Sequence, residues 1–254
     1  MRAAPWAPGE RLRARPWHLC WAALAFLTVW RTAARRVPDN DPDVWGRAVV
    51  CYPAVGLLLG AVQAAAWWGL EQARVPWPQV FVVALGVVLT GALHMDGVMD
   101  AADGLFGGTT PAERLRIMRD ERVGAFGVLA GVFAVLFKVA LLTPRGVWLA
   151  PMLGRWAAAW AVVRYPYARA QGLGRGLKDA AQTRHLLGAS ASVALVLAAW
   201  GHPSGWWAWG GVMLGTVGFA RWVQRRVPGF TGDLYGALVE TAEMLALAVV
   251  AVGG

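Results

Sequence analysis

Apolar stretches alternate with short polar connections along most of the chain. Seven of these stretches are close in length to the about 20 residues that an α-helix needs to cross a bilayer. They are predicted to span the membrane at 48–70, 77–95, 123–142, 147–163, 185–200, 206–220 and 235–252. The predicted fold is therefore all-α, a polytopic membrane helix bundle of about seven transmembrane helices that forms a single integral membrane domain over residues 1–254.

The composition strengthens this prediction. Of the 254 residues, 57% are hydrophobic and only 15% are charged, and the mean hydropathy is +0.46, which is too apolar for an ordinary soluble domain. The formal net charge of +9 comes mostly from arginine. In a membrane protein such charge first indicates loops that stay in the cytoplasm, so nucleic acid is not an expected partner.

The arginines gather in alternate connections, and this pattern predicts the orientation of the chain. They precede the first span and follow the second, fourth and sixth: Arg31, Arg35, Arg36, Arg47; Arg114, Arg116, Arg119, Arg122; Arg164, Arg169, Arg175, Arg184; Arg221, Arg225, Arg226. The other connections carry little more than Glu71, Arg74, Arg145 and His202. By the positive-inside rule, the arginine-rich connections face the cytoplasm, and the protein is expected in the cytoplasmic (inner) cell membrane.

Residues 17–30 form one further apolar stretch, and it is short and flanked by tryptophans. A crossing at this point would place Arg11, Arg13 and Arg15 outside the cell, against the charge pattern of the remaining connections. We therefore expect an N-terminal interfacial helix at 17–30, lying in the cytoplasmic interface or only dipping into the membrane.

The candidate chemistry is concentrated in residues 93–104, Leu-His-Met-Asp-Gly-Val-Met-Asp-Ala-Ala-Asp-Gly. On a helix, steps of four and three residues place Asp96, Asp100 and Asp103 within a narrow arc of one face. Three like charges repel one another unless a cation binds them, so these hard oxygen ligands predict a divalent-metal site. The plain alternative is a solvated helix end that is paired with nearby arginines. Two glycines in the same stretch favour the metal site. Glycine weakens a helix, so a glycine inside one usually serves close packing or ligand binding.

A second charged helix is predicted directly after this stretch. Thr110 as N-cap, Pro111 as the first helical residue and Glu113 three residues after the cap match a capping box. The helix is expected to run from 111 to about 123. Residues 96–122 together form the predicted cytoplasmic active-site segment.

Several residues around this segment are candidates for supporting roles. Asp120 is a possible fourth carboxylate, with an ion pair to Arg116 as the alternative. Arg119 and Arg122 are candidate phosphate ligands, because a guanidinium offers a planar fork of donors, although loop arginines also serve as topology signals. His94 lies on the opposite side of an ideal helix from the first aspartate, so it joins the cluster as a base or supporting group only if the helix breaks.

Four ionisable residues lie inside predicted spans: Lys138, Arg155, Glu240 and Glu243. Charge inside a membrane is costly and normally faces the bundle interior or a wet cavity. Snorkelling near a span end accounts for Lys138. Arg155 and Glu240 are the better candidates for a polar cavity, whether they pair with each other or face a substrate.

Five segments together resemble the cobalamin synthase family, also called adenosylcobinamide-GDP ribazoletransferase. They are 52–60 (Tyr-Pro-Ala-Val-Gly-Leu-Leu-Leu-Gly), 90–104 (the aspartate stretch with Thr-Gly-Ala before it), 116–120 (Arg-Ile-Met-Arg-Asp), 172–174 (Gly-Leu-Gly), and 231–233 (Thr-Gly-Asp) leading to Glu240. The resemblance covers nearly the whole chain. One departure is Glu121, because many members of the family carry serine after the aspartate.

The resemblance implies a magnesium-dependent membrane transferase of the last stage of cobalamin (vitamin B12) biosynthesis. Such an enzyme transfers the adenosylcobinamide phosphate moiety of adenosylcobinamide-GDP to α-ribazole or α-ribazole 5′-phosphate and releases GMP. These small molecules and membrane lipid are the expected partners, and a homo-oligomer is left open. The implied site comprises catalytic Asp96, Asp100 and Asp103; metal ligands Asp96, Asp100, Asp103 and Asp120 for Mg²⁺; and substrate-binding Arg119, Arg122, Arg155, Asp233 and Glu240.

Three other functions compete with this reading. A CDP-alcohol phosphotransferase of phospholipid synthesis also begins its pattern with Asp-Gly, but the Ala-Arg pair that follows in such enzymes is missing here, and Asp100 occupies that neighbourhood. A prenyltransferase is disfavoured because only one aspartate-rich motif is present. A membrane transporter would use the charges inside the spans as a relay, yet the carboxylates cluster in a cytoplasmic loop rather than at mid-membrane.

Overall fold

The protein is seen here in a computed structural model, which describes residues 15–37, 43–169 and 173–253. Within these residues the structure is helical and has no strand, so the predicted all-α class is confirmed. The elements are α1 (Pro16–Leu27), η1 (Arg31–Arg36), α2 (Val44–Arg47), η2 (Ala48–Cys51), α3 (Tyr52–Gln72), α4 (Pro78–Leu89), α5 (Leu93–Gly107), α6 (Pro111–Ile117), α7 (Ala125–Leu141), α8 (Gly146–Arg164), α9 (Leu173–Ala180), α10 (Thr183–Trp200), α11 (Pro203–Gln224) and α12 (Gly232–Val252).

Among the residues that the structure describes, two helical segments are long and apolar enough to cross a membrane, judged by length and composition. One is Val44–Gln72, which joins α2, η2 and α3, and the other is α12. The pair α4 and α5 makes a third if it is counted as one broken span. These apolar helices indicate a membrane protein. The larger count of about seven spans stays a prediction.

The predicted span at 77–95 is not one straight helix. α4 ends at Leu89, α5 begins at Leu93, and the two are bent by 88°. Gly91 and Ala92, with φ values of 60° and 58°, adopt the left-handed conformation that ends a helix. The turn lies inside an apolar run, where only Thr90 and Gly91 mark it in the sequence.

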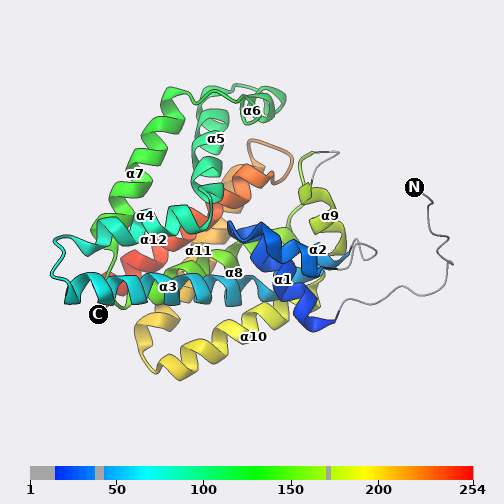
Figure 1. Ribbon diagram of the computed structural model, residues 1–254. Helices are drawn as coiled ribbons and strands as arrows, with labels where there is room; N and C mark the ends of the chain where they lie inside the picture. Colours follow the sequence, from blue (N-terminus) through cyan, green and yellow to red (C-terminus); the bar gives the residue numbers. More distant parts are fainter. Residues whose placement is uncertain (1–14, 38–42, 170–172, 254) are drawn as a thin grey trace, which may run out of the picture.

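α8 forms the centre of the bundle and is buried along nearly its whole length. Its small alanine and glycine residues let neighbouring helices approach closely. α3 and α12 pack along it, and α10 and α11 cover further parts of its surface. Figure 1 shows α3, α8, α10 and α12 running side by side along the long axis of the molecule.

α5 stands nearly at right angles to this bundle, with α6 at its far end, and α7 leads back toward the bundle (Figure 1). α5 packs against α12 and α7, and its C-terminal half meets α6. The acidic helix therefore runs from the interior of the bundle to its edge, and its two ends have different surroundings.

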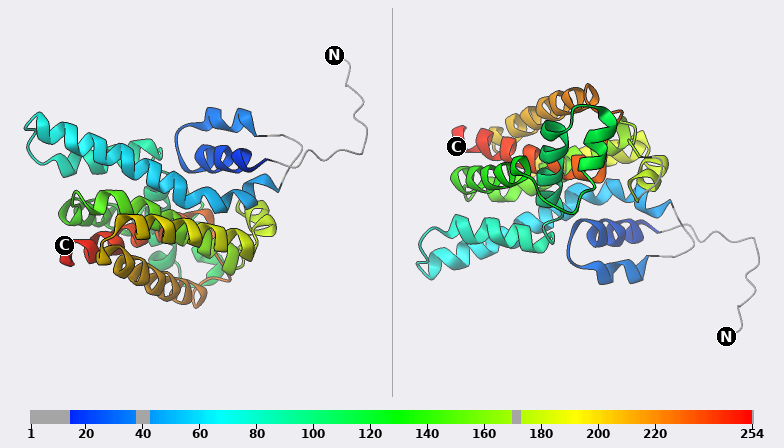
Figure 2. Two further views of the ribbon diagram at one scale, coloured as in Figure 1. Left: turned by 90° about the horizontal axis from the view of Figure 1, so that it is seen from below. Right: turned by 90° about the horizontal axis from the view of Figure 1, so that it is seen from above.

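The connections separate toward opposite ends of the molecule. The α3–α4, α7–α8 and α10–α11 connections lie at the end that holds the C-terminus, while α2 and α9 lie at the other end (Figures 1 and 2). These three connections carry few charges, and the side of the membrane that they face stays a prediction.

The apolar segment at 17–30 forms α1, which is followed by η1. α1 buries Ala22, Ala23 and Leu27 and packs against η2 and the start of α3. A helix at this place is confirmed, and its position at the membrane interface stays a prediction.

Candidate functional site

A cavity of about 230 Å³ lies where the first turn of α5 meets the start of α12, with α1, α3 and α8 completing its walls. Three residues singled out from the sequence line it: His94, Asp96 and Asp233. Arg169 and three tyrosines line it as well. Charged groups from three distant parts of the chain therefore converge on one hollow, which is the usual anatomy of a binding site.

The aspartate stretch is helical, as predicted, and one of its carboxylates, that of Asp96, lines this cavity. Asp96 is exposed and lines the cavity, and Asp100 follows one turn later on α5. The Asp100 carboxylate is repelled by Asp96, Asp233 and Asp103 and is attracted by Arg169. Neither Asp96 nor Asp100 forms an ion pair with a described residue, since the salt bridges within the described ranges involve other acids.

A short contact between two connections brings Arg169 to the site. The backbone N–H of Ala168 donates to the Phe230 carbonyl oxygen (2.7 Å), and the Phe230 N–H donates to the Pro166 carbonyl oxygen (2.9 Å). Arg169 then donates from its guanidinium to Asp233 Oδ2 (2.9 Å). The Arg169 side chain is not singled out by the sequence, where it counts only as one of many loop arginines, because its partner lies far along the chain.

Two glycines allow α5 and α12 to come together at this point. A Cβ added at Gly97 would lie 2.7 Å from the Asp233 carbonyl oxygen, and one at Gly236 would lie 3.2 Å from the backbone of His94. The helices thus cross backbone to backbone. This close packing explains why a glycine stands at position 97 of the helix. It also places Asp96 near Asp233.

His94 also reaches the site, although α5 does not break at Gly97. The cavity wraps around the first turn of α5, so His94 and Asp96 line it from different sides of the helix. His94 is buried, and its Nδ1 lies 3.3 Å from a guanidinium nitrogen of Arg155. The histidine therefore connects the cavity to the charges deeper in the bundle.

Asp103 has a different environment from the other two aspartates. Its buried carboxylate accepts hydrogen bonds from the backbone N–H groups of Gly124 (2.7 Å) and Gly127 (2.8 Å), at the start of α7. A carboxylate in this position satisfies free amides and stabilises the helix N-terminus. Each carboxylate oxygen accepts one hydrogen bond and keeps a second lone pair that could bind a metal ion. A role for Asp103 as metal ligand or catalyst therefore stays a prediction.

The second charged helix begins as predicted but ends early. Thr110 accepts a hydrogen bond from the Glu113 N–H (3.2 Å), while Glu113 accepts from the Thr109 N–H (2.9 Å) rather than from Thr110. α6 stops at Ile117, short of the expected end near 123, because the chain tightens into a turn there, with the Asp120 N–H donating to the Ile117 carbonyl oxygen (2.9 Å).

Asp120, Arg119 and Arg122 lie in this turn, on the surface. Arg122 Nε donates to Asp120 Oδ1 (3.2 Å), and this hydrogen bond lowers the pKa of the Asp120 carboxyl below its ordinary value. The arginine partner is thus Arg122 rather than Arg116. The structure does not bring these three residues to the cavity, whose lining comes from other elements, so their roles stay predictions.

The four charges inside the predicted spans form one buried network. Lys138 Nζ donates to Glu240 (2.7 Å) and to Glu243, and Arg155 donates to Glu243. The Lys138 side chain is only 13% exposed, so the snorkelling interpretation is wrong. Arg155 and Glu240 do not pair with each other directly, and binding of substrate by either stays a prediction.

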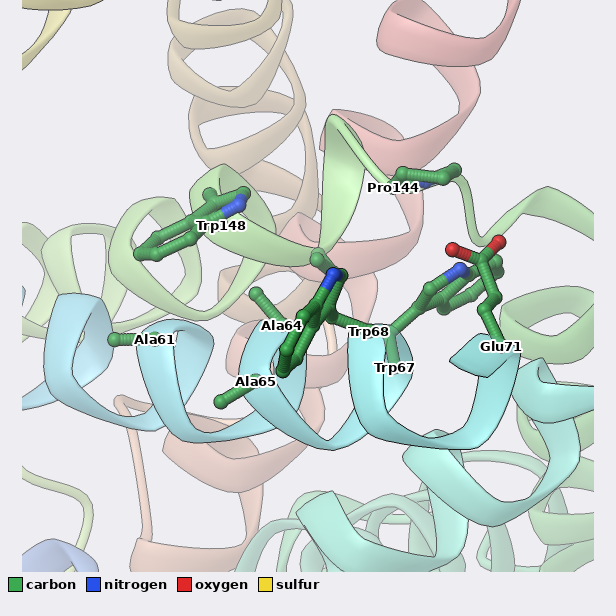
Figure 3. Close-up of a pocket in the computed structure, with 9 residues that line it drawn as sticks. Ala61, Ala64, Ala65, Trp67, Trp68, Glu71, Pro144 and Trp148 are labelled. Carbon is green, nitrogen blue, oxygen red and sulfur yellow. The ribbon is translucent and has the colours of Figure 1, made fainter. Parts of the chain in front are cut away.

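A larger cavity, of about 420 Å³, lies at the other end of α3 (Figure 3). Trp67, Trp68 and Trp148 surround a floor of alanines there, with Glu71 at one side. Its lining is apolar apart from Glu71 and the indole nitrogens, and it holds no cluster of converging charges. We therefore assign the candidate site to the smaller cavity, because Asp96, Asp233 and Arg169 line it together.

The two carboxylates Asp96, in the lining of the smaller cavity, and Asp100, one turn further along α5, fit a magnesium ion. No three histidine, cysteine, aspartate or glutamate side chains converge on one point within the described residues. Mg²⁺ is usually held by one or two carboxylates together with substrate phosphates and water. Asp96 and Asp100, which are adjacent on the helix and not neutralised by an ion pair, match that requirement.

Carboxylates and an arginine at one cavity of a helical membrane protein suit chemistry on phosphate-containing groups. The chain belongs to the cobalamin-5-phosphate synthase family, which matches residues 19–251. It is 37% identical over 245 residues to an adenosylcobinamide-GDP ribazoletransferase of Desulforamulus reducens, covering 91% of this chain and 95% of that protein.

Two further relatives carry the same name. The enzyme of Desulfitobacterium hafniense is 37% identical over 250 residues, with 89% of this chain and 94% of that protein covered. The enzyme of Roseiflexus sp. is 39% identical over 238 residues, with 89% and 86% covered. No solved structure matches the chain. The family expected from the sequence motifs is confirmed.

Proposed function

We propose that this protein transfers the adenosylcobinamide phosphate moiety of adenosylcobinamide-GDP to α-ribazole or α-ribazole 5′-phosphate, with release of GMP, as the last stage of cobalamin biosynthesis. Membership of the family and the names of the relatives support this reaction. The observation that carries the proposal is the convergence of Asp96, Asp233 and Arg169 at one cavity, with Asp100 one helical turn from Asp96 and within electrostatic reach of these charges. These groups suit a diphosphate and an attacking hydroxyl.

The chemical step is the attack of a ribose hydroxyl oxygen on the phosphorus that carries the cobinamide side. A new oxygen–phosphorus bond forms, the bond from that phosphorus to the bridging oxygen breaks, and GMP leaves with the bridging oxygen. A carboxylate of the α5 aspartates takes the proton of the attacking hydroxyl. Arg169 binds the diphosphate, because a planar guanidinium matches phosphate oxygens.

Asp96 and Asp100 hold Mg²⁺ in this proposal. When bound, the ion supplies positive charge that neutralises and orients the diphosphate oxygens. The two carboxylates repel each other in the free protein, so binding a cation relieves that repulsion. Asp233 holds Arg169 in place through their ion pair, which orients the guanidinium at the cavity.

The proposal includes the place of the protein in the cell. The charge pattern supports about seven spans in the inner membrane, with the aspartate helix on the cytoplasmic side, where nucleotide substrates are dissolved. The apolar surface of the bundle supports contact with membrane lipid.

The nucleotide that the protein releases tests this proposal. Purified protein in lipid vesicles with Mg²⁺ is given radiolabelled adenosylcobinamide-GDP with α-ribazole, or a radiolabelled CDP-lipid with an alcohol acceptor. The expected result is GMP release that requires both cobalamin precursors, and no CMP release. Release of CMP alone would show a lipid phosphotransferase, and release of neither nucleotide would contradict transfer chemistry.

A further inference from the structure

The candidate cavity contains buried hydroxyls without partners. Tyr52, from α3, is 2% exposed, and Tyr235, from α12, is 8% exposed. Both line the cavity, and both hydroxyl oxygens lack a hydrogen-bond partner among the described residues. The Arg169 Nε, in the same wall, also lacks one. A buried unpaired polar atom is costly, so these atoms point to a ligand that supplies the missing partners.

The remainder of the lining is largely apolar and partly aromatic. Phe26 stacks on Tyr52 with ring centroids 6.3 Å apart, and Ala158, Val162 and Val239 contribute aliphatic surface. At about 230 Å³ the cavity is smaller than the about 300–1,000 Å³ of pockets that hold drug-sized ligands. It therefore suits a small fused aromatic ring with few polar atoms, and it excludes a macrocycle.

We propose that this cavity binds the benzimidazole ring of the ribazole acceptor, and this inference rests on the proposed function. The ring nitrogen that does not carry the ribose is the single acceptor of the base, and a tyrosine hydroxyl donates to it. The carbon edge of the ring lies against the aliphatic wall. The ribose then extends toward Asp96, which lines the cavity and is exposed at its mouth.

The competing occupants fit the lining less well. Guanine, the base of the donor, presents several donors and acceptors along its edges, and it is usually bound by a free carboxylate or amide. The Asp233 carboxylate is engaged by Arg169 (2.9 Å) and by the Thr231 hydroxyl (3.2 Å). The unpaired Asp96 carboxylate is exposed rather than buried among the apolar lining, where the base would lie. The corrin ring is a macrocycle, so it stays outside the cavity and presents its phosphate at the mouth.

The test compares Tyr52→Phe and Tyr235→Phe with the wild type, using the full chain in lipid nanodiscs. Each variant is expected to weaken equilibrium binding of α-ribazole, measured without the donor, by about 3- to 10-fold. The KM for α-ribazole rises by a similar factor, while the KM for adenosylcobinamide-GDP is unchanged. Thermal stability without ligand is the same or higher, because an unpaired buried hydroxyl is removed.

Tyr165→Phe is the matched control, since Tyr165 is not part of the cavity lining, and it should bind α-ribazole as the wild type does. A higher KM for the donor alone would assign the cavity to guanine and overturn the inference. Unchanged binding and kinetics in both test variants would overturn it as well. A wild type that releases no GMP would instead contradict the proposed function, so the two failures are distinguishable.

Discussion

The aspartates of α5 and its neighbouring turn look equivalent in the sequence, but their surroundings differ. Asp96 lines the cavity and Asp100 follows one turn later, both without an ion-pair partner in the described ranges. Asp103 accepts hydrogen bonds from the start of α7, and Asp120 pairs with Arg122 on the surface. Helical spacing identifies which residues share a face. It does not show which carboxylate accepts hydrogen bonds from distant backbone amides, because that depends on how the start of α7 packs against α5.

Asp103→Ala tests the capping role. The change removes two hydrogen bonds to backbone amides at the α7 N-terminus, and comparable cap removals cost about 1–2 kcal/mol of stability. We expect a lower unfolding temperature in detergent. Asp103→Asn, which keeps one acceptor oxygen, should lose less. An unchanged unfolding temperature together with lost activity would instead indicate a metal ligand.

At the scale of the elements, the close contact between α5 and α12 brings the residues of the site together. Apolar length predicts most helices of this fold to within a few residues, because burial in a bilayer or core demands it. The break at Gly91 and Ala92 escapes prediction, since a single Thr-Gly pair at 90–91 inside an apolar run is a weak signal for a sharp turn. The cavity also depends on residues far apart in the chain, such as Tyr52 and Tyr235, and only the family motifs hint at them.

Gly97→Ala tests this crossing. The added Cβ would lie 2.7 Å from the Asp233 carbonyl oxygen, which is part of the backbone and moves only if α12 shifts. We expect α-ribazole turnover to fall at least tenfold, together with a lower unfolding temperature. Gly210→Ala is the control, because a Cβ there meets nothing within 4 Å. Full activity in Gly97→Ala would show that close backbone contact is not needed.

At the scale of the whole molecule, the buried charges join α7, α8 and α12. Lys138, Arg155, Glu240 and Glu243 come from these three helices, and two cations balance two anions. The sequence predicts that such residues face the interior, because exposure to lipid is too costly. It does not predict the pairing, which depends on how the three helices meet.

Glu243→Gln tests this balance. It leaves Lys138 and Arg155 with one anion between them, and breaking a buried pair typically costs about 3–5 kcal/mol. We expect a large fall in unfolding temperature. The double variant Lys138→Met with Glu240→Gln removes one charge of each sign and keeps the Arg155–Glu243 pair, so it should lose less. Equal losses would contradict a stabilising balance of charge.

The rate of GMP release by aspartate variants tests the central claim most directly. Wild type, Asp96→Asn, Asp100→Asn and Asp179→Asn are compared in vesicles with Mg²⁺, adenosylcobinamide-GDP and α-ribazole. Asp179, an exposed residue of α9 that pairs with Arg175, serves as the control. Asp96→Asn and Asp100→Asn are predicted to lose at least about 100-fold in rate, while Asp179→Asn keeps the wild-type rate. A folded, membrane-inserted Asp96→Asn or Asp100→Asn variant that releases GMP at the wild-type rate would contradict the account.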